Sequence, residues 1–439
     1  MKNRPLLTAF LLLAAQQIFF LSFFPPFIEP DSAGYIGLAE SLLSSGGFTG
    51  DMRLPGYPAF LAFFYFVFGH SNLPVIIFQH LLGLAVWLLF IKILETDRQK
   101  LVFSALYFCD LLYNSYQHAV LSDFFFSFLL CLSAWLAWLY RRDGKPAFLF
   151  LCGLLIGFGI LTKPALRLFP FFILPVFLYS RQPLKRRLAH TAVFLAAPLL
   201  AVNLWSLRNY LYTGYYSLLP MESYHYIGRV VNHIEFPENS VTKKYFMKEL
   251  PQSKVPRNRK AAVVHTAMDE LRENGIKSEV IDSEFRQIFR LSILRHPFTY
   301  LKESGIEMFY FFFSAHNLYA KNALGNRLPV SFESSMRSGN PAGALLKVLV
   351  SLHPFYWLSF ALLVWFTSVS ACKLASERDF FTMYLYGLIA YIALVSSMAN
   401  EGLARYRCAV QPFLLFFAAL ALDRLIKSPS AGKRKEDAP

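Results

Sequence analysis

Residues 29–58 carry the side chains best suited to chemistry in the apolar first half of the chain. Asp31 offers a carboxylate that can accept a proton, and Arg53 offers a guanidinium that can bind a phosphate. Between them, apolar side chains recur at i, i+3, i+4 and i+7, at Tyr35, Leu38, Ala39 and Leu42. This spacing predicts a short amphipathic helix on the membrane surface, which would hold both charged side chains at the depth of lipid headgroups.

Asp31 has two interpretations. Asp is a favoured helix N-cap, and the predicted helix begins directly after it. A capping box would need Glu or Gln three residues later, where the chain has Gly34. Because Arg53, Tyr57 and further cations are expected on the same side of the membrane, we favour a catalytic base. Partial burial is expected to raise the pKa of this carboxyl group towards a value useful for a base.

Basic residues of several other loops are expected on that side. Lys163 and Arg167 interrupt the hairpin between the fifth and sixth apolar spans, Arg208 ends the seventh, and Arg405 and Arg407 open the last. Long basic side chains can lie at an interface by extending to water. Cations set against the usual distribution of charge indicate function more often. We predict that Arg407 lines a cleft and that the other four bind an anionic group together with the guanidinium of the first loop.

The acidic and hydrogen-bonding side of the same cleft is predicted from Asp123 and His118, with Tyr35 and Tyr57 as further lining residues. Asp123 opens the fourth span, so it could also act as a helix cap. Asp31, Asp123 and His118 could together bind a divalent metal, although their spacing does not require one. Whether a metal takes part stays open.

The composition places these residues in a membrane protein. The 439 residues are 55% apolar, 17% aromatic and only 16% charged, which leaves too little polar surface for a soluble fold. The formal charge of +15 comes from short clusters between apolar spans, so it reports topology, and no nucleic-acid partner is expected. The five cysteines lie in or beside apolar spans without metal-ligand spacing, so no disulfide framework and no structural zinc are expected.

The fold class predicted is an all-α polytopic membrane protein with about ten transmembrane helices. The apolar spans cover residues 6–24, 73–94, 101–117, 121–140, 147–162, 165–180, 188–206, 344–370, 380–398 and 408–426. Two further apolar pieces, 57–69 and 300–313, are shorter than the roughly 20 residues that a span needs. We interpret them as interfacial helices.

Charge distribution predicts the orientation. If both short pieces stay on one side, clusters such as Arg141–Lys145 and Lys185–Arg187 become cytoplasmic, as the positive-inside rule requires. The candidate site then faces outward. The predicted divisions are a transmembrane module at 1–208 with a catalytic outer loop at 25–72, a helical extracytoplasmic region at 209–343, transmembrane helices at 344–427 and a cytoplasmic tail at 428–439.

Several short motifs follow one another in an order typical of one family. They are DSAGYIGLAESLL with RLPGYPAFLAFFYFVFG, then GLLIGFGILTKPALRLFP, WSLRNYLYTGYYSL, FRLSILRHPFTYLKESG and RYRCAVQPF. In this order the chain resembles the GT-C glycosyltransferases, polytopic enzymes that take sugar from a polyprenyl phosphate carrier and include protein O-mannosyltransferase-like and aminoarabinose transferase-like members. The specificity lies in the order of the motifs, since each one is short and apolar-rich.

The resemblance implies that Asp31 is the first-loop acidic residue, acting as general base or near a metal, and that Arg53 contacts the carrier phosphate. The chain departs from the protein O-mannosyltransferase branch at Ser32, where that branch has Glu after the Asp. The outer region is also small beside the appended domain with which oligosaccharyltransferase subunits hold peptide. The implied partners are a polyprenyl-phosphate-linked sugar donor, membrane lipids, and a lipid, glycan or protein acceptor, and the implied location is the bacterial cytoplasmic membrane.

The chemistry agrees with this implication. Nucleotide sugars are not supplied outside the cytoplasm, and the cytoplasmic connections carry no Gly-rich phosphate loop, so an outward-facing transferase needs a membrane-borne donor. A phosphate leaving group needs charge stabilisation, the acceptor hydroxyl needs a base, and an in-line displacement inverts the sugar carbon. Two alternatives stay open. One is a ligase or polymerase of diphosphate-linked glycans, which could use His225, Arg229, His233 and His265, and the other is a transporter of lipid-linked glycans.

Overall fold

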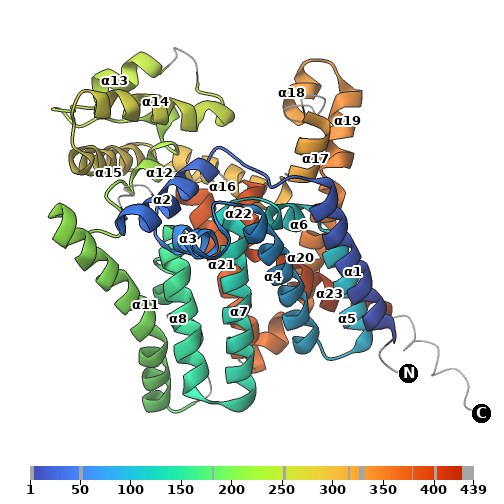
Figure 1. Cartoon of the computed structure of the whole chain (residues 1–439). Helices are drawn as coiled ribbons and strands as arrows, with labels where there is room; N and C mark the ends of the chain where they lie inside the picture. Colours follow the sequence, from blue (N-terminus) through green and yellow to red (C-terminus); the bar gives the residue numbers. More distant parts are fainter. Residues whose placement is uncertain are drawn as a thin grey trace, which may run out of the picture.

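The computed structural model describes residues 4–48, 53–179, 182–250, 254–314, 317–325, 332–377, 379–399 and 403–427. The tail predicted at 428–439 lies outside these residues. Over the described ranges the chain forms helices and no strand, with one isolated bridge between Phe27 and Ala119. The predicted all-α class is therefore confirmed (Figure 1).

The helices have the following bounds. The first part holds α1 Arg4–Phe23, α2 Ser32–Ser45, α3 Gly56–Phe68, α4 Leu73–Ile93, α5 Asp97–Cys109, α6 Leu111–Gln117, α7 Ser122–Asp143, α8 Pro146–Thr162, η1 Pro164–Leu166, α9 Phe169–Phe172, α10 Leu174–Leu178 and α11 Leu184–Thr213. The region predicted to be extracytoplasmic, which is named the outer region for that prediction, holds α12 Tyr224–Ile227, η2 Val231–His233, α13 Lys243–Glu249, η3 Arg257–Arg259, α14 Lys260–Glu273, α15 Ser278–Arg295, α16 Pro297–Phe313, α17 Leu318–Leu324, α18 Phe332–Arg337 and α19 Pro341–Val350. The last part holds α20 His353–Glu377, α21 Phe380–Ala399, α22 Ala404–Arg407, η5 Cys408–Val410 and α23 Gln411–Lys427.

Among the described residues, seven helices are long and apolar enough to cross a membrane: Arg4–Phe23, Leu73–Ile93, Ser122–Asp143, Leu184–Thr213, His353–Cys372, Phe380–Ala399 and Ala404–Ile426. Large apolar side chains stay exposed along these helices, as contact with lipid requires. The protein is thus a multi-pass membrane protein. The 17 residues of α8 form a further apolar helix that is just shorter than these seven.

Three of the ten predicted spans are interrupted, including the one that overlaps His353–Cys372. The span at 101–117 breaks at Asp110, whose carboxylate accepts a hydrogen bond from the backbone N–H of Tyr113 at 3.0 Å and caps α6. The span at 165–180 falls into η1, α9 and α10, each of which carries a proline in its first turn. The span at 344–370 is two helices, α19 and α20, that part at Leu352, whose φ is 56°.

The first outer loop carries two interfacial helices, as predicted. In α2 the predicted apolar stripe faces the protein, with Tyr35 and Ala39 buried. With 13 residues, α3 is too short to cross a bilayer. The bridge at Phe27 fixes the start of this loop, because Phe27 exchanges backbone hydrogen bonds with His118 and Val120 in the turn before α7. The loop is therefore held against the beginning of α7.

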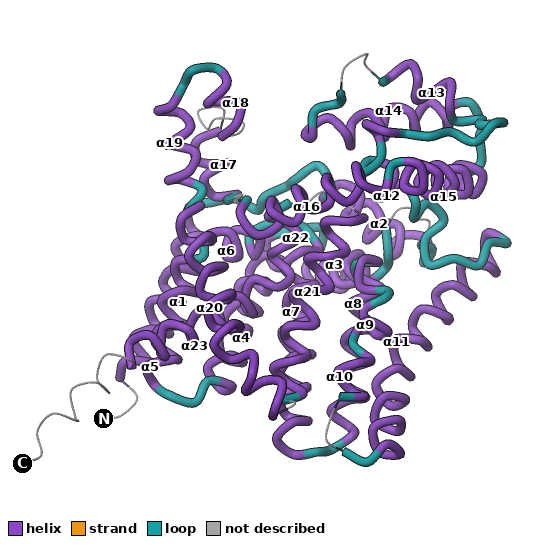
Figure 2. The backbone as a smooth tube through the Cα atoms, turned by 180° about the vertical axis from the view of Figure 1, so that it is seen from behind, coloured by secondary structure: helices purple, strands orange, loops and turns teal. Residues whose placement is uncertain are grey.

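The outer region has an apolar core of its own, formed mainly by α12 to α15 around Phe246, Leu271 and Phe285. Figure 1 and Figure 2 both show these helices over one side of the membrane helices, while α17 to α19 stand over the other side. Tyr300 of α16 belongs to the same core, and its hydroxyl donates to the carbonyl of Met398 in α21 at 2.7 Å. The outer region is thereby joined to the membrane helices.

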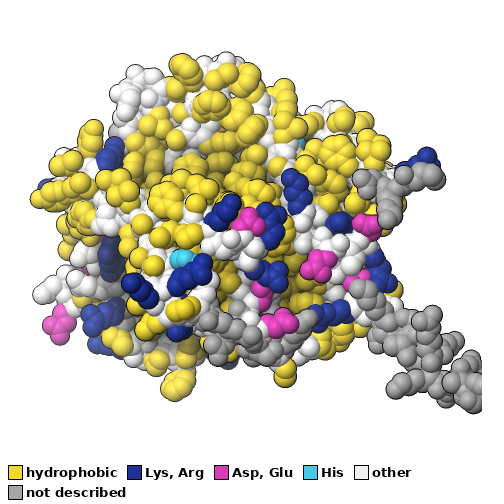
Figure 3. Space-filling view, turned by 90° about the horizontal axis from the view of Figure 1, so that it is seen from below, with side chains coloured by type: hydrophobic (Ala, Val, Ile, Leu, Met, Phe, Trp, Pro, Cys, Tyr) yellow, Lys and Arg dark blue, Asp and Glu magenta, His cyan; other side chains and the backbone are white. Residues whose placement is uncertain are grey.

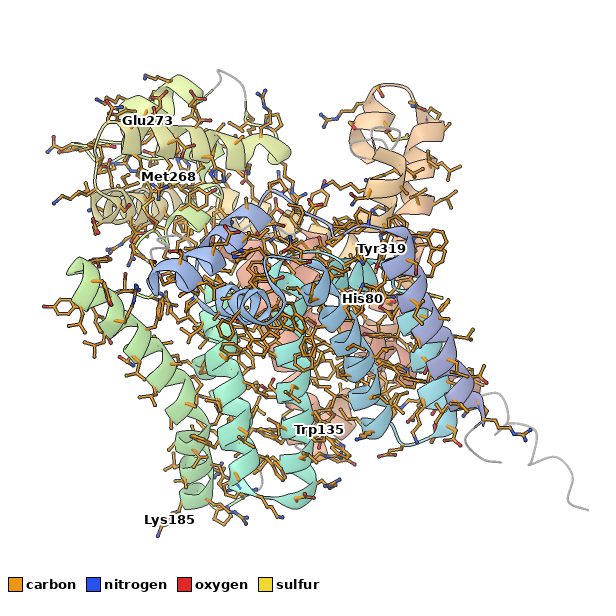
Figure 4. The ribbon with its side chains drawn as sticks, in the orientation of Figure 1. His80, Trp135, Lys185, Met268, Glu273 and Tyr319 are labelled. Carbon is orange, nitrogen blue, oxygen red and sulfur yellow. The ribbon has the colours of Figure 1, made fainter. Side chains whose placement is uncertain are left out.

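The basic turns at α7–α8 and at the start of α11 lie at one end of the molecule. The turn from α7 to α8 and the start of α11 lie at the lower end of Figure 1, and Lys185 is labelled there in Figure 4, whereas Met268 and Glu273 lie at the upper end. Seen from below, Lys and Arg side chains lie across the middle and lower part of the surface, with apolar side chains over most of the rest (Figure 3). The basic turns and the outer region are therefore at opposite ends.

Candidate active site

A cavity of about 530 Å³ lies where the membrane helices meet the outer region. Its wall includes six residues that the sequence analysis singled out for the cleft or its ligand: Asp31, Tyr35, Arg53, Lys163, Arg167 and Arg405. The first outer loop, the turn after α8 and the segment before α23 supply them. Asp31 thus shares one cavity with Arg53 and Lys163, which the proposed chemistry requires.

Asp31 does not cap α2, because its side chain makes no cap hydrogen bond. One carboxylate oxygen accepts from Nη2 of Arg53 at 2.8 Å, and the other accepts from Nη1 of Arg405 at 2.5 Å. Burial raises the pKa of Asp31, but the charges of Arg405 and Arg53 outweigh burial and lower this pKa to about 2. The expectation of a raised pKa is therefore wrong for this arrangement of side chains, in which Asp31 is ionised at neutral pH.

Asp123 joins the same network from the start of α7. Its carboxylate is 1% exposed and accepts from Nζ of Lys163 at 2.5 Å and from Nε of Arg405 at 2.9 Å. Arg405 therefore bridges the two carboxylates, giving a continuous row from Arg53 through Asp31, Arg405 and Asp123 to Lys163. Three cations surround two carboxylates, so the row keeps one positive charge that a phosphate could balance.

Local packing holds the row in place. The hydroxyl group of Tyr35 hydrogen-bonds to Ser122 Oγ at 2.9 Å, which ties α2 to α7. The guanidinium of Arg53 lies over the Tyr35 ring, 5.0 Å from its centroid. It also passes Gly34, where an added Cβ would come within 3.6 Å of the Arg53 Nε atom. A Cβ at Gly34 would thus make only an ordinary van der Waals contact with Arg53, and the guanidinium packs directly beside α2.

Gly56 sets the distance between α3 and α8. A Cβ at this position would lie 2.4 Å from the hydroxyl oxygen of Thr162 and 2.8 Å from the carbonyl oxygen of Leu161. Gly56 follows Arg53 by three residues, and Thr162 directly precedes Lys163. The contact of these two helices therefore fixes the separation of two cations in the cavity wall.

Gly56→Ala is accordingly expected to push α3 away from α8, destabilising the protein by about 1–3 kcal/mol and lowering activity. Gly37→Ala is the matched control, because a Cβ there meets nothing within 4 Å. Thermal unfolding of both variants in detergent, followed by fluorescence-detected size exclusion, measures the difference. Equal unfolding temperatures for the two variants would show that the α3–α8 contact is not tight.

Two of the predicted residues are held away from the cavity by other partners. The guanidinium of Arg208 donates to the carbonyl of Phe48 at 2.5 Å and lies against the rings of Trp205 and Tyr212. Arg407 is fully buried and donates to the carbonyls of Phe311 and Phe312, at the end of α16. Arg208 and Arg407 both satisfy backbone carbonyls, and neither is part of the cavity wall.

Tyr57 and His118 are also outside the cavity wall. Tyr57 is fully buried and donates to Oε1 of Gln79 at 3.2 Å, so it serves the packing of α3 against α4. The ring nitrogens of His118 contact Nε2 of His80 and the carbonyl of Phe24, each at 2.9 Å. His118 is therefore held by His80 of α4 and by the backbone after α1, and it is not part of the cavity wall.

These placements bear on the metal that Asp31, Asp123 and His118 could have bound. Both oxygens of each carboxylate already accept from arginine or lysine, and His118 is bonded elsewhere. Within the described ranges no three metal-binding side chains come together. The residues present do not fit a metal centre in this arrangement, and the function proposed below uses only the side chains of the chain.

The outer region supplies cavity residues that sequence reasoning did not identify. Glu222, Tyr224 and Tyr226 line the wall, and Glu222 accepts from Nη1 of Arg167 at 2.5 Å and from the hydroxyl of Tyr226 at 2.8 Å. Arg167 is thus already paired. The short α12 that carries two of these tyrosines has four residues, too few for any periodicity to show in the sequence.

Four residues named for the diphosphate alternative also lie in the outer region. His225, Arg229 and His265 line the cavity, and His233 does not. Burial, with a smaller contribution from the charge of Arg53, lowers the pKa of His225 to about 4, so this imidazole is neutral at physiological pH. The outer region therefore faces the Asp31 network with a neutral histidine and a cation.

Comparison with known proteins agrees with this architecture. Residues 53–205 match the family described as dolichyl-phosphate-mannose-protein mannosyltransferase. The oligosaccharyltransferase of Archaeoglobus fulgidus, solved with a tethered acceptor peptide, is 13% identical with a TM-score of 0.52, over 100% of this chain and 51% of that one. The archaeal oligosaccharyltransferase AglB from Archaeoglobus fulgidus, in complex with an inhibitory peptide and a dolichol-phosphate, is 12% identical with a TM-score of 0.49, over 99% of this chain and 52% of that one. ArnT from Cupriavidus metallidurans bound to undecaprenyl phosphate is 16% identical with a TM-score of 0.38, over 97% of this chain and 78% of that one.

The chain spans about half the length of the oligosaccharyltransferase structures that it matches. No curated protein matches it. The likeness at a TM-score of 0.52 concerns the fold. The family match covers the segment from Arg53 to Trp205, within α11, and includes Asp123 and Lys163. Together, the fold and this matched segment confirm the resemblance to the GT-C glycosyltransferases that the order of the sequence motifs predicted.

Proposed function

We propose that the protein is an integral membrane glycosyltransferase that moves a sugar from a polyprenyl-phosphate donor to an acceptor hydroxyl, with inversion at the sugar carbon. The observation that carries this proposal is the row Arg53–Asp31–Arg405–Asp123–Lys163 at one end of the membrane helices. Every residue of the row except the buried Asp123 lines the cavity, so the prediction that Asp123 lines it is wrong. The row brings a carboxylate base and a surplus of cations to one place, which is the combination that phosphate departure and hydroxyl attack need.

The low pKa of Asp31 fits a base that is released when the donor binds. Both of its oxygens are held by Arg53 and Arg405, and a carboxylate with a pKa near 2 is a weak base. A donor phosphate competes for the same two guanidinium groups. As they turn to the phosphate, Asp31 loses the charges that lower its pKa and becomes more basic, while Asp123 still anchors Lys163 and Arg405.

The transfer step then balances without an added reactant. The acceptor oxygen attacks the anomeric carbon as its proton passes to the carboxylate of Asp31. The bond between the anomeric carbon and the phosphate oxygen breaks, and polyprenyl phosphate leaves with the electron pair. The cations of the row stabilise the negative charge that develops on the departing phosphate.

Arg53→Gln is expected to raise KM for the donor about tenfold or more while changing the acceptor KM little, because a charge-assisted hydrogen bond to the phosphate is lost. Arg208→Gln is the matched control, since Arg208 is bound to Phe48 outside the cavity. Initial rates with a short-chain polyprenyl-phosphate sugar measure both constants. If Arg53→Gln raised the acceptor KM alone, the donor role of Arg53 would be wrong.

The site is proposed to face the extracytoplasmic side of a bacterial cytoplasmic membrane. Ser44→Cys, on exposed α2, should react with a membrane-impermeant maleimide in intact cells, in a background in which the exposed thiols Cys109 and Cys372 are replaced by Ser. Lys145→Cys, in the exposed turn after α7, should react only after lysis. The reverse pattern of labelling would invert the topology.

The diphosphate-glycan alternative gains support from one observation, because His225, Arg229 and His265 line the same cavity. Such an enzyme would use a carrier diphosphate as the leaving group. Offering the purified protein equal amounts of a polyprenyl monophosphate sugar and a polyprenyl diphosphate sugar distinguishes the two. The proposed function requires turnover of the monophosphate, and a transporter would leave the sugar attached to its carrier in both cases.

A further inference from the structure

Arg229 is a buried cation in the part of the cavity wall that the outer region forms. Arg229 follows Gly228, the residue at the end of α12, and the exposed fraction of Arg229 is 1%. Nη2 donates to Ser304 Oγ at 3.3 Å, but among the described residues Nε has no hydrogen-bond partner, and Nη1 only approaches an oxygen of Glu307, at 3.6 Å. Leaving the donors of a buried charge unused costs free energy unless a ligand accepts from them.

Glu307 does not neutralise Arg229 alone, because it is shared with a second guanidinium. Nε of Arg257 donates to both oxygens of Glu307 at 3.1 Å, and its Nη2 donates to one of them at 2.8 Å. This forked pairing is the strong form of an arginine–carboxylate contact. Two guanidinium groups therefore share one buried carboxylate, and this part of the wall keeps a positive charge.

The neighbouring side chains do not remove that charge. Lys260, itself 5% exposed, is balanced by Glu303 at 3.4 Å. His233 interacts electrostatically with Arg229, Lys260 and Glu303, and in the described chain neither of its ring nitrogens has a hydrogen-bond partner. The polar groups around Arg229 are thus either already paired or, like His233, unused.

We propose that Arg229 binds an oxyanion of the acceptor, so that the acceptor carries a phosphate or a carboxylate in addition to the hydroxyl that receives the sugar. The inference rests on the proposed function and names the chemical class of its second substrate. The row at Asp31 holds one positive charge for the donor phosphate, and Arg229 holds another on the wall that the outer region contributes. A neutral acceptor would leave Arg229 and Arg257 with the single carboxylate of Glu307 between them, and would leave Nε and Nη1 of Arg229 without an acceptor in the described chain.

Equilibrium binding of radiolabelled inorganic phosphate tests the inference, with the full chain in phosphatidylcholine nanodiscs at low ionic strength. Wild-type protein should bind phosphate at two sites. Arg229→Gln should weaken one of them about tenfold or more, and Arg53→Gln should weaken the other. The control is Arg295→Gln, because Arg295 is an exposed residue of α15 that pairs with Glu235 away from the cavity.

Each result decides one claim. Two undiminished sites in Arg229→Gln, or wild-type binding that only Arg53→Gln affects, would overturn the acceptor inference and leave the donor proposal standing. If Arg53→Gln kept both sites while Arg229→Gln lost one, the acceptor inference would stand and the donor role of Arg53 would be wrong. Absence of phosphate binding in the wild type would reject both.

Glu307→Gln separates a charge effect from damage to the fold. Removing the carboxylate that Arg229 shares with Arg257 should raise phosphate affinity at the second site about tenfold, whereas a disturbed fold would lower it. Unchanged or weaker binding in a variant that keeps the wild-type unfolding temperature counts against the inference.

Competition against the labelled phosphate identifies the anion. Displacement from the second site by glucose 6-phosphate alone indicates a phosphorylated acceptor, and displacement by glucuronate alone indicates a carboxylate-bearing one. Displacement by glucose at the same concentration would refute the requirement for an anion.

Discussion

Asp31→Asn is expected to lower the rate of sugar transfer by about 10²–10⁴-fold while the protein stays abundant in the membrane. Asn has the same shape as Asp and can still accept a hydrogen bond from Arg53 or Arg405, but it cannot take the proton of the acceptor hydroxyl. Transfer of labelled sugar by purified protein, normalised to protein amount, measures the loss. Retained activity would remove Asp31 from the role of base.

A matched variant and the kinetic constants separate chemistry from structure. Glu40→Gln removes a charge from the same helix, where Glu40 is exposed and faces His70 at 3.5 Å, and should leave the rate unchanged. Loss of the base should appear in kcat. The donor KM of Asp31→Asn should not rise, because the carboxylate that competes with the donor phosphate for two guanidinium groups has been removed.

Arg405→Gln is expected to have the second largest effect, with loss of most activity and of about 3 kcal/mol of stability or more. Arg405 is the only described side chain that contacts both carboxylates of the row. Without it the buried carboxylate of Asp123 keeps Lys163 alone as a charged partner, and removing one partner of a buried ion pair is costly. Thermal unfolding and the donor KM together measure the effect.

Two further variants make this expectation specific. Arg405→Lys should recover part of the stability but little of the activity, since one ammonium group cannot donate from two separate positions as a guanidinium does. Arg424→Gln, at the other end of the last span, loses a contact with Ser370 and should keep the donor KM of the wild type. A wild-type donor KM in Arg405→Gln would mean that Arg405 has no part in donor binding.

Much of the framework could be predicted from the sequence because it depends on local pattern. The apolar stripe through Tyr35 and Ala39 predicts the surface helix, and the 13-residue α3 is too short to cross the bilayer. The sequence also contains the residues that interrupt two of the predicted spans. Asp110 and the prolines after Lys163 interrupt apolar runs that hydropathy alone treats as continuous.

Only part of the site could be predicted. Asp31, Arg53, Lys163, Arg167 and Arg405 were each chosen by type and by their expected side of the membrane, and the cavity contains all of them. The same criteria also selected Arg208 and His118, which do not line it. A basic or polar side chain near the interface can bind a backbone carbonyl as readily as a ligand, as Arg208 does at Phe48, and local sequence does not distinguish the two.

The sequence by itself therefore determined the class of fold, the surface helix of the first loop and the kinds of charged residue that gather at one end of the membrane helices. Tertiary structure alone decided which charges pair. Arg405 reaches Asp31 across 374 positions and Asp123 across 282, and these contacts set the low pKa of Asp31. The physical reason is that amphipathic spacing acts within one or two helical turns, whereas charges interact through space, at distances that only the folded chain fixes.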